Sequence, residues 1–131
     1  MKRRELREQT FRVLFGAEFH DASEMPHQME VYGETEQAWG EKDGAYISKK
    51  CTDIIAHLAE IDASINDVAE GWKTGRMGKV DLTLLRLAVY EMRYEEEIPV
   101  SVAINEAVEL AKKYGTDDSP AFVNGILAKL V

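Results

Sequence analysis

The sequence of 131 residues has little of what cross-links, kinks or loosens a chain: one cysteine, three prolines and nine glycines. A lone cysteine, Cys51, leaves no pair for an internal disulfide and agrees with a reducing compartment. The low proline and glycine content, beside 45% hydrophobic and 31% charged residues, excludes collagen-like and low-complexity chains. The composition is that of one folded domain of ordinary length.

Long apolar runs are also missing. The most apolar stretch, residues 82–92, is interrupted by Arg86 and Glu91 and falls short of the ~18 apolar residues that a membrane span needs. The N-terminal MKRRELREQ is basic, but the apolar segment of a secretory signal does not follow it. We therefore expect a cytoplasmic protein.

The net charge of −8 is unevenly distributed along the chain. Residues 2–12 have a local balance of +3, so the remaining residues carry −11. The basic residues of this end are Lys2, Arg3, Arg4, Arg7 and Arg12. Such a basic end is suited to binding an anion, and the acidic remainder to binding a cationic partner. The simpler alternative is a charged first helical turn that only aids solubility.

Strand signals are almost absent, and the spacing of apolar residues predicts helices along most of the chain. The predicted helices lie at residues 3–19, in a short stretch after Pro26, and at 47–58, 62–72, 80–94, 100–114 and 119–130. The helix at 80–94 is apolar almost all the way round, which predicts a central position.

Several residues are expected to begin or end these helices. Asp62 is predicted to cap the helix that follows it. Gly115 is predicted to take the left-handed conformation after residue 114. Ser119 is predicted to be the N-cap of the last helix, with Pro120 at the first helical position.

The residues that an enzyme or a metal centre needs are sparse. His20 and His27 lack the i, i+4 spacing that puts two ligands on one helical face. Cys51 falls on an apolar stripe and is expected to be a core residue rather than a nucleophile. No glycine-rich phosphate loop with its lysine is present. We therefore expect a binding protein that uses no metal or cofactor, and not an enzyme.

Two groups of residues are candidates for RNA binding. Arg3, Arg4 and Arg7 fall within roughly a 100° arc of a helix, and guanidinium groups bind phosphates and stack on unpaired bases. At the start of the last helix, Asp118 and Phe122 could hold a base through an exocyclic amine and through stacking. From composition alone, the structural explanations are favoured: Asp118 is a good helix-capping residue, and Phe122 fits the apolar stripe of the core.

Four segments of the second half are distinctive in their order and spacing. They are Gly71 and Trp72 with Arg76, VDLTLLRLAVYEM at 80–92, IPVSVAINEAVELAKKYG at 98–115 and DSPAFVNGILAKL at 118–130. Together they cover about half of the chain and resemble the NusB family of bacterial transcription antitermination factors.

The resemblance implies an all-α fold of about seven helices, arranged as two three-helix bundles that share one core. Residues 1–131 would then form a single RNA-binding domain, with an N-terminal half of about 1–75 and a C-terminal half of about 76–131. A homodimer of such domains is compatible with the fold.

The resemblance also implies a role in transcription. Proteins of this family bind boxA RNA together with the ribosomal protein NusE, within the RNA polymerase antitermination complex, chiefly on ribosomal RNA operons. Carried onto this sequence, the expected RNA contacts are Lys2, Arg3, Arg4, Arg7, Asp118 and Phe122. An acidic surface near Asp81, Glu91 and the turn around Glu95 is expected to receive the basic partner.

Gly125 lies inside a predicted helix and is interpreted as a fold determinant, because its cost of ~1 kcal/mol relative to alanine is tolerable if another helix packs closely there. The alternatives to an RNA-binding adaptor are a helical protein–protein module or dimer with a solubilising basic end, and a DNA-binding regulator. The last is disfavoured because the candidate recognition helices carry acidic residues.

Overall fold

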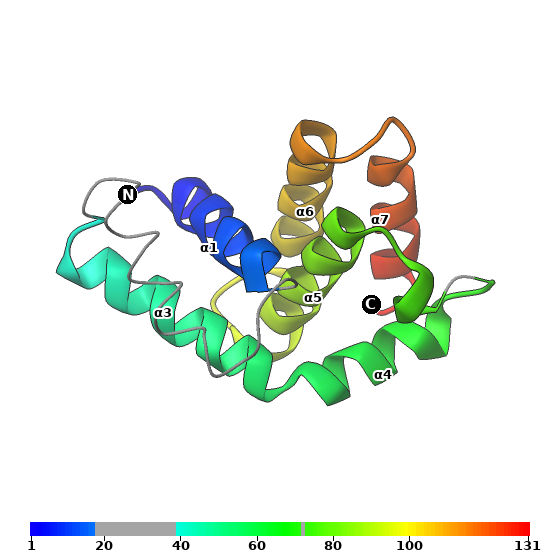
Figure 1. The fold of residues 1–131 in the computed structure, drawn as a ribbon, viewed down its shortest axis with the longest axis horizontal. Helices are drawn as coiled ribbons and strands as arrows, with labels where there is room; N and C mark the ends of the chain where they lie inside the picture. The colour runs from blue at the N-terminus through cyan, green and yellow to red at the C-terminus, as the bar shows by residue number, and fades with distance from the viewer. Residues whose placement is uncertain (18–38, 72) are drawn as a thin grey trace. The chain divides into compact units, whose positions relative to one another are not determined.

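The computed structural model describes residues 1–17, 39–71 and 73–131. Within these residues the chain forms six α-helices and one 3₁₀ helix, with no strand, which confirms the all-α expectation. The elements are α1 (Arg3–Ala17), α3 (Glu41–Ala56), α4 (Leu58–Val68), η2 (Thr74–Arg76), α5 (Lys79–Tyr94), α6 (Val100–Tyr114) and α7 (Ser119–Ala128) (Figure 1). None of these helices is long and apolar enough to cross a membrane. The predicted helix after Pro26, and both His20 and His27, lie outside the described residues.

The described chain divides into two compact units, Met1–Ala56 and His57–Val131. The boundary between the two units therefore lies before α4. The reason is that α4 packs on α5. Asp62, which was predicted to cap a helix, lies inside α4 and accepts two hydrogen bonds from the Arg86 guanidinium of α5, at 2.9 and 2.7 Å. The helix starts earlier, after His57.

In the first unit, α1 packs on α3. The buried apolar residues are Phe11, Val13 and Leu14 of α1 and Ile47, Cys51 and Ile54 of α3. The Cys51 thiol lies 3.8 Å from the carbonyl oxygen of Thr10, and burial raises its pKa to about 12. Cys51 is therefore a core residue, as the apolar stripe predicted.

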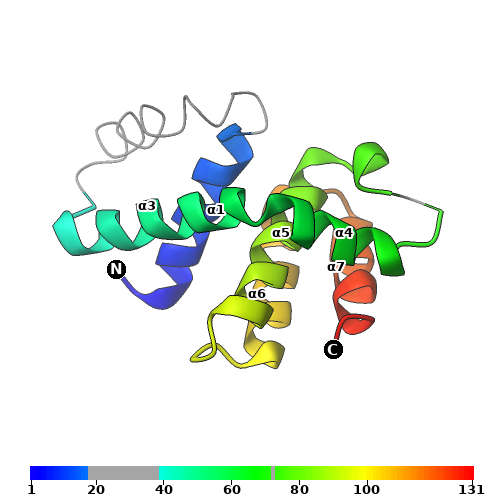
Figure 2. The same ribbon diagram turned by 90° about the horizontal axis from the view of Figure 1, so that it is seen from below.

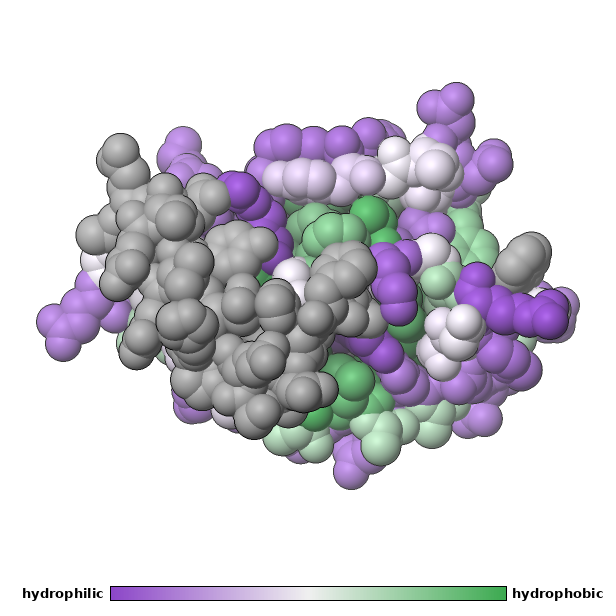
Figure 3. Space-filling view, in the orientation of Figure 1, coloured by the Kyte–Doolittle hydropathy of each residue, from purple (hydrophilic) through white to green (hydrophobic). Residues whose placement is uncertain are grey.

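In the second unit, α5 is the central helix, as its sequence predicted, because it contacts α4, α6 and α7 (Figure 2). Its buried residues lie on several sides of the helix: Leu82, Thr83, Leu84, Leu85, Leu87, Ala88, Val89, Tyr90 and Glu91. Helix α6 buries mainly small residues, Ala103, Ala107 and Ala111 among them, and small side chains let helices approach closely. Figure 3 shows hydrophilic residues along the upper edge of the face that it draws, and apolar residues below them.

The turn between α6 and α7 depends on the absence of a side chain at Gly115. This glycine has φ −96° and ψ −165°, an extended conformation, so the predicted left-handed conformation is wrong. A Cβ atom there would lie 2.5 Å from Ser119 Cβ and 2.8 Å from the carbonyl oxygen of Ala111. Ser119 is buried and its hydroxyl accepts a hydrogen bond from the Thr116 amide at 3.0 Å. Glycine is therefore required at position 115 because a side chain would clash with its neighbours, and not because of the backbone dihedral angles.

The first turn of α7 differs from the prediction by one residue. The N-cap is Asp118 instead of Ser119, and its carboxylate makes no capping hydrogen bond. The Ser119 hydroxyl instead accepts the hydrogen bond from the Thr116 amide in the preceding turn. The Asp118 carboxylate therefore does not stabilise the start of α7 through a hydrogen bond.

Gly125 has open space around it. No atom lies within 4 Å of the position that its Cβ would occupy, and the residue is exposed on α7. Close packing of another helix therefore does not account for this glycine within the described residues.

These two glycines give a matched test of packing. We expect Gly115→Ala to lower the free energy of unfolding by about 1–3 kcal/mol, because the new methyl group overlaps Ser119. We expect Gly125→Ala to raise it by about 1 kcal/mol, because alanine is the better helix former. Urea unfolding followed by circular dichroism measures both. Equal effects of the two substitutions would contradict the steric account.

Candidate nucleic-acid interface

A pocket in the second unit brings together residues from three separate segments. Its volume is about 310 Å³, near the lower end of the range for small-ligand sites. The lining residues are Arg76, Met77 and Gly78 before α5, Asp81 in the first turn of α5, and Asp118 and Phe122 at the start of α7. The pocket thus joins Asp118 and Phe122, predicted to bind RNA, to Asp81, predicted to bind a protein partner.

The segment before α5 is held in place by a side chain of α4. Asn66 accepts a hydrogen bond from the Thr74 amide at 2.8 Å and lies 3.3 Å from the Thr74 hydroxyl. The 3₁₀ turn that starts at Thr74 continues to Met77, which is 8% exposed and fixes the end of the turn in the interior. Arg76 itself is exposed, and its side chain makes no hydrogen bond or ion pair to the described part of the chain.

The contribution of Arg76, Met77 and Gly78 to the pocket was not predicted from the sequence. Arg76 was noted only as part of a segment that resembles the NusB family, and no role was predicted for it. The signal that could have located it is the short distance along the chain between this segment and the first turn of the central helix.

Phe122 is the large apolar residue of α7 that does not join the core. It is partly exposed and lines the pocket, whereas Val123, Ile126 and Leu127 of the same helix are buried. Its ring is therefore open to a ligand in the pocket. This placement favours stacking on a base over the core interpretation that composition alone allowed.

Two of the predicted contact residues are in the interior. Glu91 is 1% exposed and Arg7 is 5% exposed. Glu91 belongs to the buried set of α5, because a helix that packs on three others leaves little of its surface outside. As placed here, neither residue can contribute to an exposed binding surface, and both predictions are corrected.

The remaining basic residues at the start of α1 are exposed. Lys2, Arg3 and Arg4 all lie at the surface of the first unit. The amino group of Met1 donates a hydrogen bond to the Asp43 carboxylate at 2.8 Å, and this interaction raises the pKa of the amino group. The chain end is thus attached to the first turn of α3, and the exposed cations follow directly after it.

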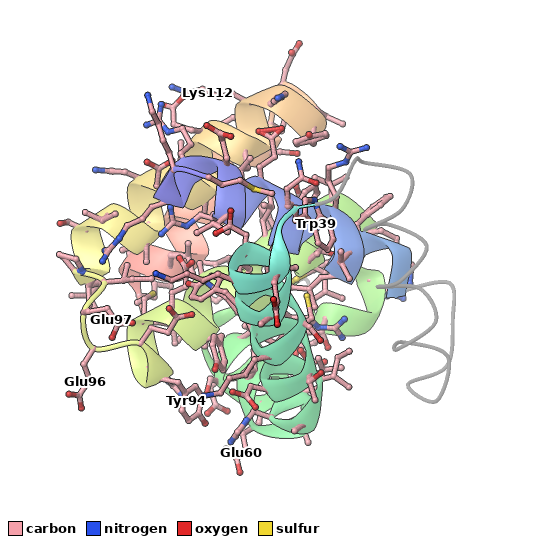
Figure 4. The ribbon with its side chains drawn as sticks, turned by 90° about the vertical axis from the view of Figure 1, so that its left-hand side faces the viewer. Trp39, Glu60, Tyr94, Glu96, Glu97 and Lys112 are labelled. Atoms are coloured by element: carbon pink, nitrogen blue, oxygen red, sulfur yellow. The ribbon has the colours of Figure 1, made fainter. Side chains whose placement is uncertain are left out.

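The acidic surface predicted for a partner is present only in part. Glu96 and Glu97 are exposed on the turn after α5, and Figure 4 shows both pointing outward. Nearby, the Tyr94 hydroxyl donates to the Glu60 carboxylate at 2.9 Å. Asp81 lies at the opposite end of α5, about 20 Å along the helix axis from this turn. Asp81 and the turn are therefore two separate acidic sites.

Comparison with known proteins identifies the family. The sequence model of the NusB family matches residues 4–131. The chain belongs to the NusB family. A NusB relative from Agathobacter rectalis, called transcription antitermination protein NusB, is 54% identical over 98% of both chains. A protein of the same name from Lachnoclostridium phytofermentans is 48% identical over 100% of this chain and 99% of its own.

Solved NusB structures have the same fold. NusB from T. maritima superposes with a TM-score of 0.87, at 37% identity, over 99% of this chain and 90% of the other. A structure described as antitermination factors NusB and NusE in complex with dsRNA matches with a TM-score of 0.82, at 26% identity, over 98% and 94% of the two chains. The similarity to NusB thus covers the first and second units alike.

The position of Phe122 outside the core predicts a small effect on stability. We expect Phe122→Ala to lower the free energy of unfolding by about 1 kcal/mol. Leu127→Ala, on the same helix but 0% exposed, should lower it by about 2–5 kcal/mol. Urea unfolding of both variants compares the two positions directly. If Phe122→Ala were as costly as Leu127→Ala, the ring would belong to the core.

Proposed function

We propose that the chain is a cytoplasmic transcription antitermination factor that binds boxA-type single-stranded RNA together with NusE, within the RNA polymerase antitermination complex of ribosomal RNA operons. The observation that carries the proposal is the family match over residues 4–131, with relatives named as antitermination proteins over their whole length. A related structure that contains NusB, NusE and RNA supports the choice of both partners. The role is that of an adaptor, which needs binding and no bond-making step.

Two groups of residues are proposed to contact the RNA. Lys2, Arg3 and Arg4 supply exposed cations at the start of α1, which suit phosphates. Asp118 and Phe122 supply an acceptor and an aromatic ring at the rim of one pocket, which suit a base. The first group gives affinity without sequence preference, and the second gives contact with base edges.

The balance of charge explains why a partner is needed. A few exposed cations at one end neutralise only a few phosphates, and the rest of the chain is acidic. The exposed carboxylates of Glu96 and Glu97 are proposed to attract the basic ribosomal protein. The complex would then present a larger basic surface to RNA than either protein alone.

The adaptor role is tested by titrating labelled RNA with the chain, alone and with saturating NusE. A boxA RNA, a scrambled RNA and a duplex of the boxA sequence are compared at two salt concentrations. We expect weak binding by the chain alone and at least tenfold tighter binding to single-stranded boxA RNA with NusE present. Equal affinity with and without NusE would contradict the adaptor role. Binding of NusE without any RNA preference would favour the protein–protein module instead.

The basic group on α1 makes a separate prediction. Replacing Arg3 and Arg4 together by alanine should reduce the slope of log affinity against log salt by about 1.4, since each single-strand phosphate contact contributes about 0.7. The control is Lys42→Ala with Lys49→Ala, which removes two exposed charges from α3 of the same unit. Anisotropy titrations over a salt series measure both slopes. An equal loss in the two variants would show that only net charge matters.

A further inference from the structure

The loop between α4 and α5 is tied to the end of α4 by side chains. Asn66, in the last turn of α4, accepts a hydrogen bond from the Thr74 amide at 2.8 Å and donates one to the Thr74 hydroxyl at 3.3 Å. The Lys73 ammonium group donates to the carbonyl oxygens of Asn66 and Ala69, at 2.8 and 3.3 Å. The last carbonyl groups of a helix lack partners within it, so a cation stabilises them. Lys73 and Thr74, which begin the 3₁₀ turn, are therefore both held to α4.

The 3₁₀ turn extends this constraint to Arg76. The Arg76 amide donates a hydrogen bond to the Lys73 carbonyl oxygen at 2.9 Å, and the Met77 amide donates to the Thr74 carbonyl oxygen at 3.3 Å. The Met77 side chain is buried, so the turn is held at its end as well as at its start. Asn66 thus fixes, through Thr74, the backbone from which the exposed Arg76 side chain extends.

The Arg76 guanidinium group does not contribute to the fold. Its side chain makes no hydrogen bond or ion pair with the residues that the structure describes. It pairs with neither Asp81 nor Asp118, although both carboxylates line the same pocket. An arginine on a fixed backbone, with no partner among these residues, keeps its charge and its five N–H donors for a ligand. Other cations of the second unit are engaged by neighbouring groups: Lys73, Arg86, Arg93, Lys112, Lys113 and Lys129.

Phosphate is the ligand group that suits Arg76. A guanidinium group binds phosphate oxygens through two parallel hydrogen bonds. The exposed cations proposed to contact RNA all belong to the first unit, whereas Asp118 of the second unit repels phosphate. A positive charge at the same pocket reduces this repulsion. Because its backbone is already fixed, Arg76 loses less conformational entropy on binding than an arginine on an unrestrained loop would lose.

We propose that Asn66 is a positioning residue for RNA binding: it holds the turn that presents Arg76, and Arg76 binds a phosphate of the RNA backbone. This inference rests on the proposed RNA-binding function and goes beyond it, because it assigns roles to two residues outside the contact groups named above. Asn66 itself touches no RNA. Its effect on RNA affinity passes through Thr74 to Arg76.

The salt dependence of affinity distinguishes this role from a general effect on folding. Binding of a boxA RNA is measured by anisotropy over a salt series, with the full chain and saturating NusE. Arg76→Ala should weaken binding about tenfold, the size of one charge-assisted hydrogen bond, and reduce the slope of log affinity against log salt by about 0.7. Asn66→Ala removes no charge, yet it should reduce affinity and slope in the same direction, by up to the same amounts.

A double-mutant cycle tests whether the two residues act on one contact. In the Arg76→Ala background, Asn66→Ala should change neither affinity nor slope any further. Hydrogen exchange of the Thr74 amide should be faster in Asn66→Ala, because that amide loses its acceptor. The matched control is Ser64→Ala, on the same helix, whose hydroxyl is bonded by Arg93 of α5 and not by the loop. It should keep the wild-type affinity and slope.

Stability is checked before each comparison. Alanine is the better helix former, so we expect Asn66→Ala to keep α4 intact, with a cooperative thermal transition. If Asn66→Ala does not fold, Thr74→Val takes its place, because it removes only the bond between the Thr74 hydroxyl and Asn66. It should then lower affinity and slope in the same direction as Arg76→Ala, and wild-type values in this variant would overturn the positioning role.

The outcomes separate this inference from the proposed function. If Arg76→Ala keeps the wild-type affinity and slope, Arg76 binds no phosphate, while RNA binding by the chain stands. If Asn66→Ala weakens binding equally with and without Arg76, Asn66 acts elsewhere and the inference is overturned. The same holds if Arg76→Ala weakens only NusE binding, measured calorimetrically without RNA, because Arg76 would then belong to the protein interface. If wild type binds no RNA even with NusE, the proposed function itself fails.

Discussion

The packing of α5 on three neighbours is the constraint on which the second unit depends. A helix that contacts α4, α6 and α7 has few exposed positions, and these lie mainly in its first and last turns. The last turn leads into the exposed carboxylates, and the first turn carries Asp81 to the pocket. The buried residues in the middle of α5 hold the second unit together, and only the two ends of the helix are exposed for binding. The Asp62–Arg86 pair fixes the fourth member, α4, to this hub through a partly buried ion pair.

The pocket combines groups of opposite sign, which separates affinity from selectivity. Carboxylates oppose a polyanion, so Asp81 and Asp118 weaken non-specific attraction to RNA. An ionised carboxylate stabilises a bound group only where that group brings hydrogen-bond donors to it. Cations elsewhere must then supply the general attraction, and the exposed Lys2, Arg3 and Arg4 have the required charge.

The sequence predicted helices well, because apolar periodicity records burial directly. The α5 hub, the Cys51 core position and the start of α6 at residue 100 all follow from local pattern. Contacts between distant residues were less predictable. Asp62 looked like a cap because the ion pair with Arg86, 24 residues further on, leaves no local signal. Gly115 was identified for its dihedral angles, although the crowding by Ser119 is what excludes a side chain. Arg7 and Glu91 were expected at the surface because charged side chains are usually exposed to solvent, but both are buried.

The buried thiol of Cys51 has a practical consequence for labelling this protein. Burial raises the pKa of the thiol to about 12, so it stays protonated at neutral pH, and only the thiolate reacts. The native cysteine should therefore be inert to maleimide in the folded state. A cysteine introduced at an exposed position such as Asn124 on α7 would be the one reactive thiol. A fluorophore can then be attached to the helix that carries Phe122 while the native core is left intact.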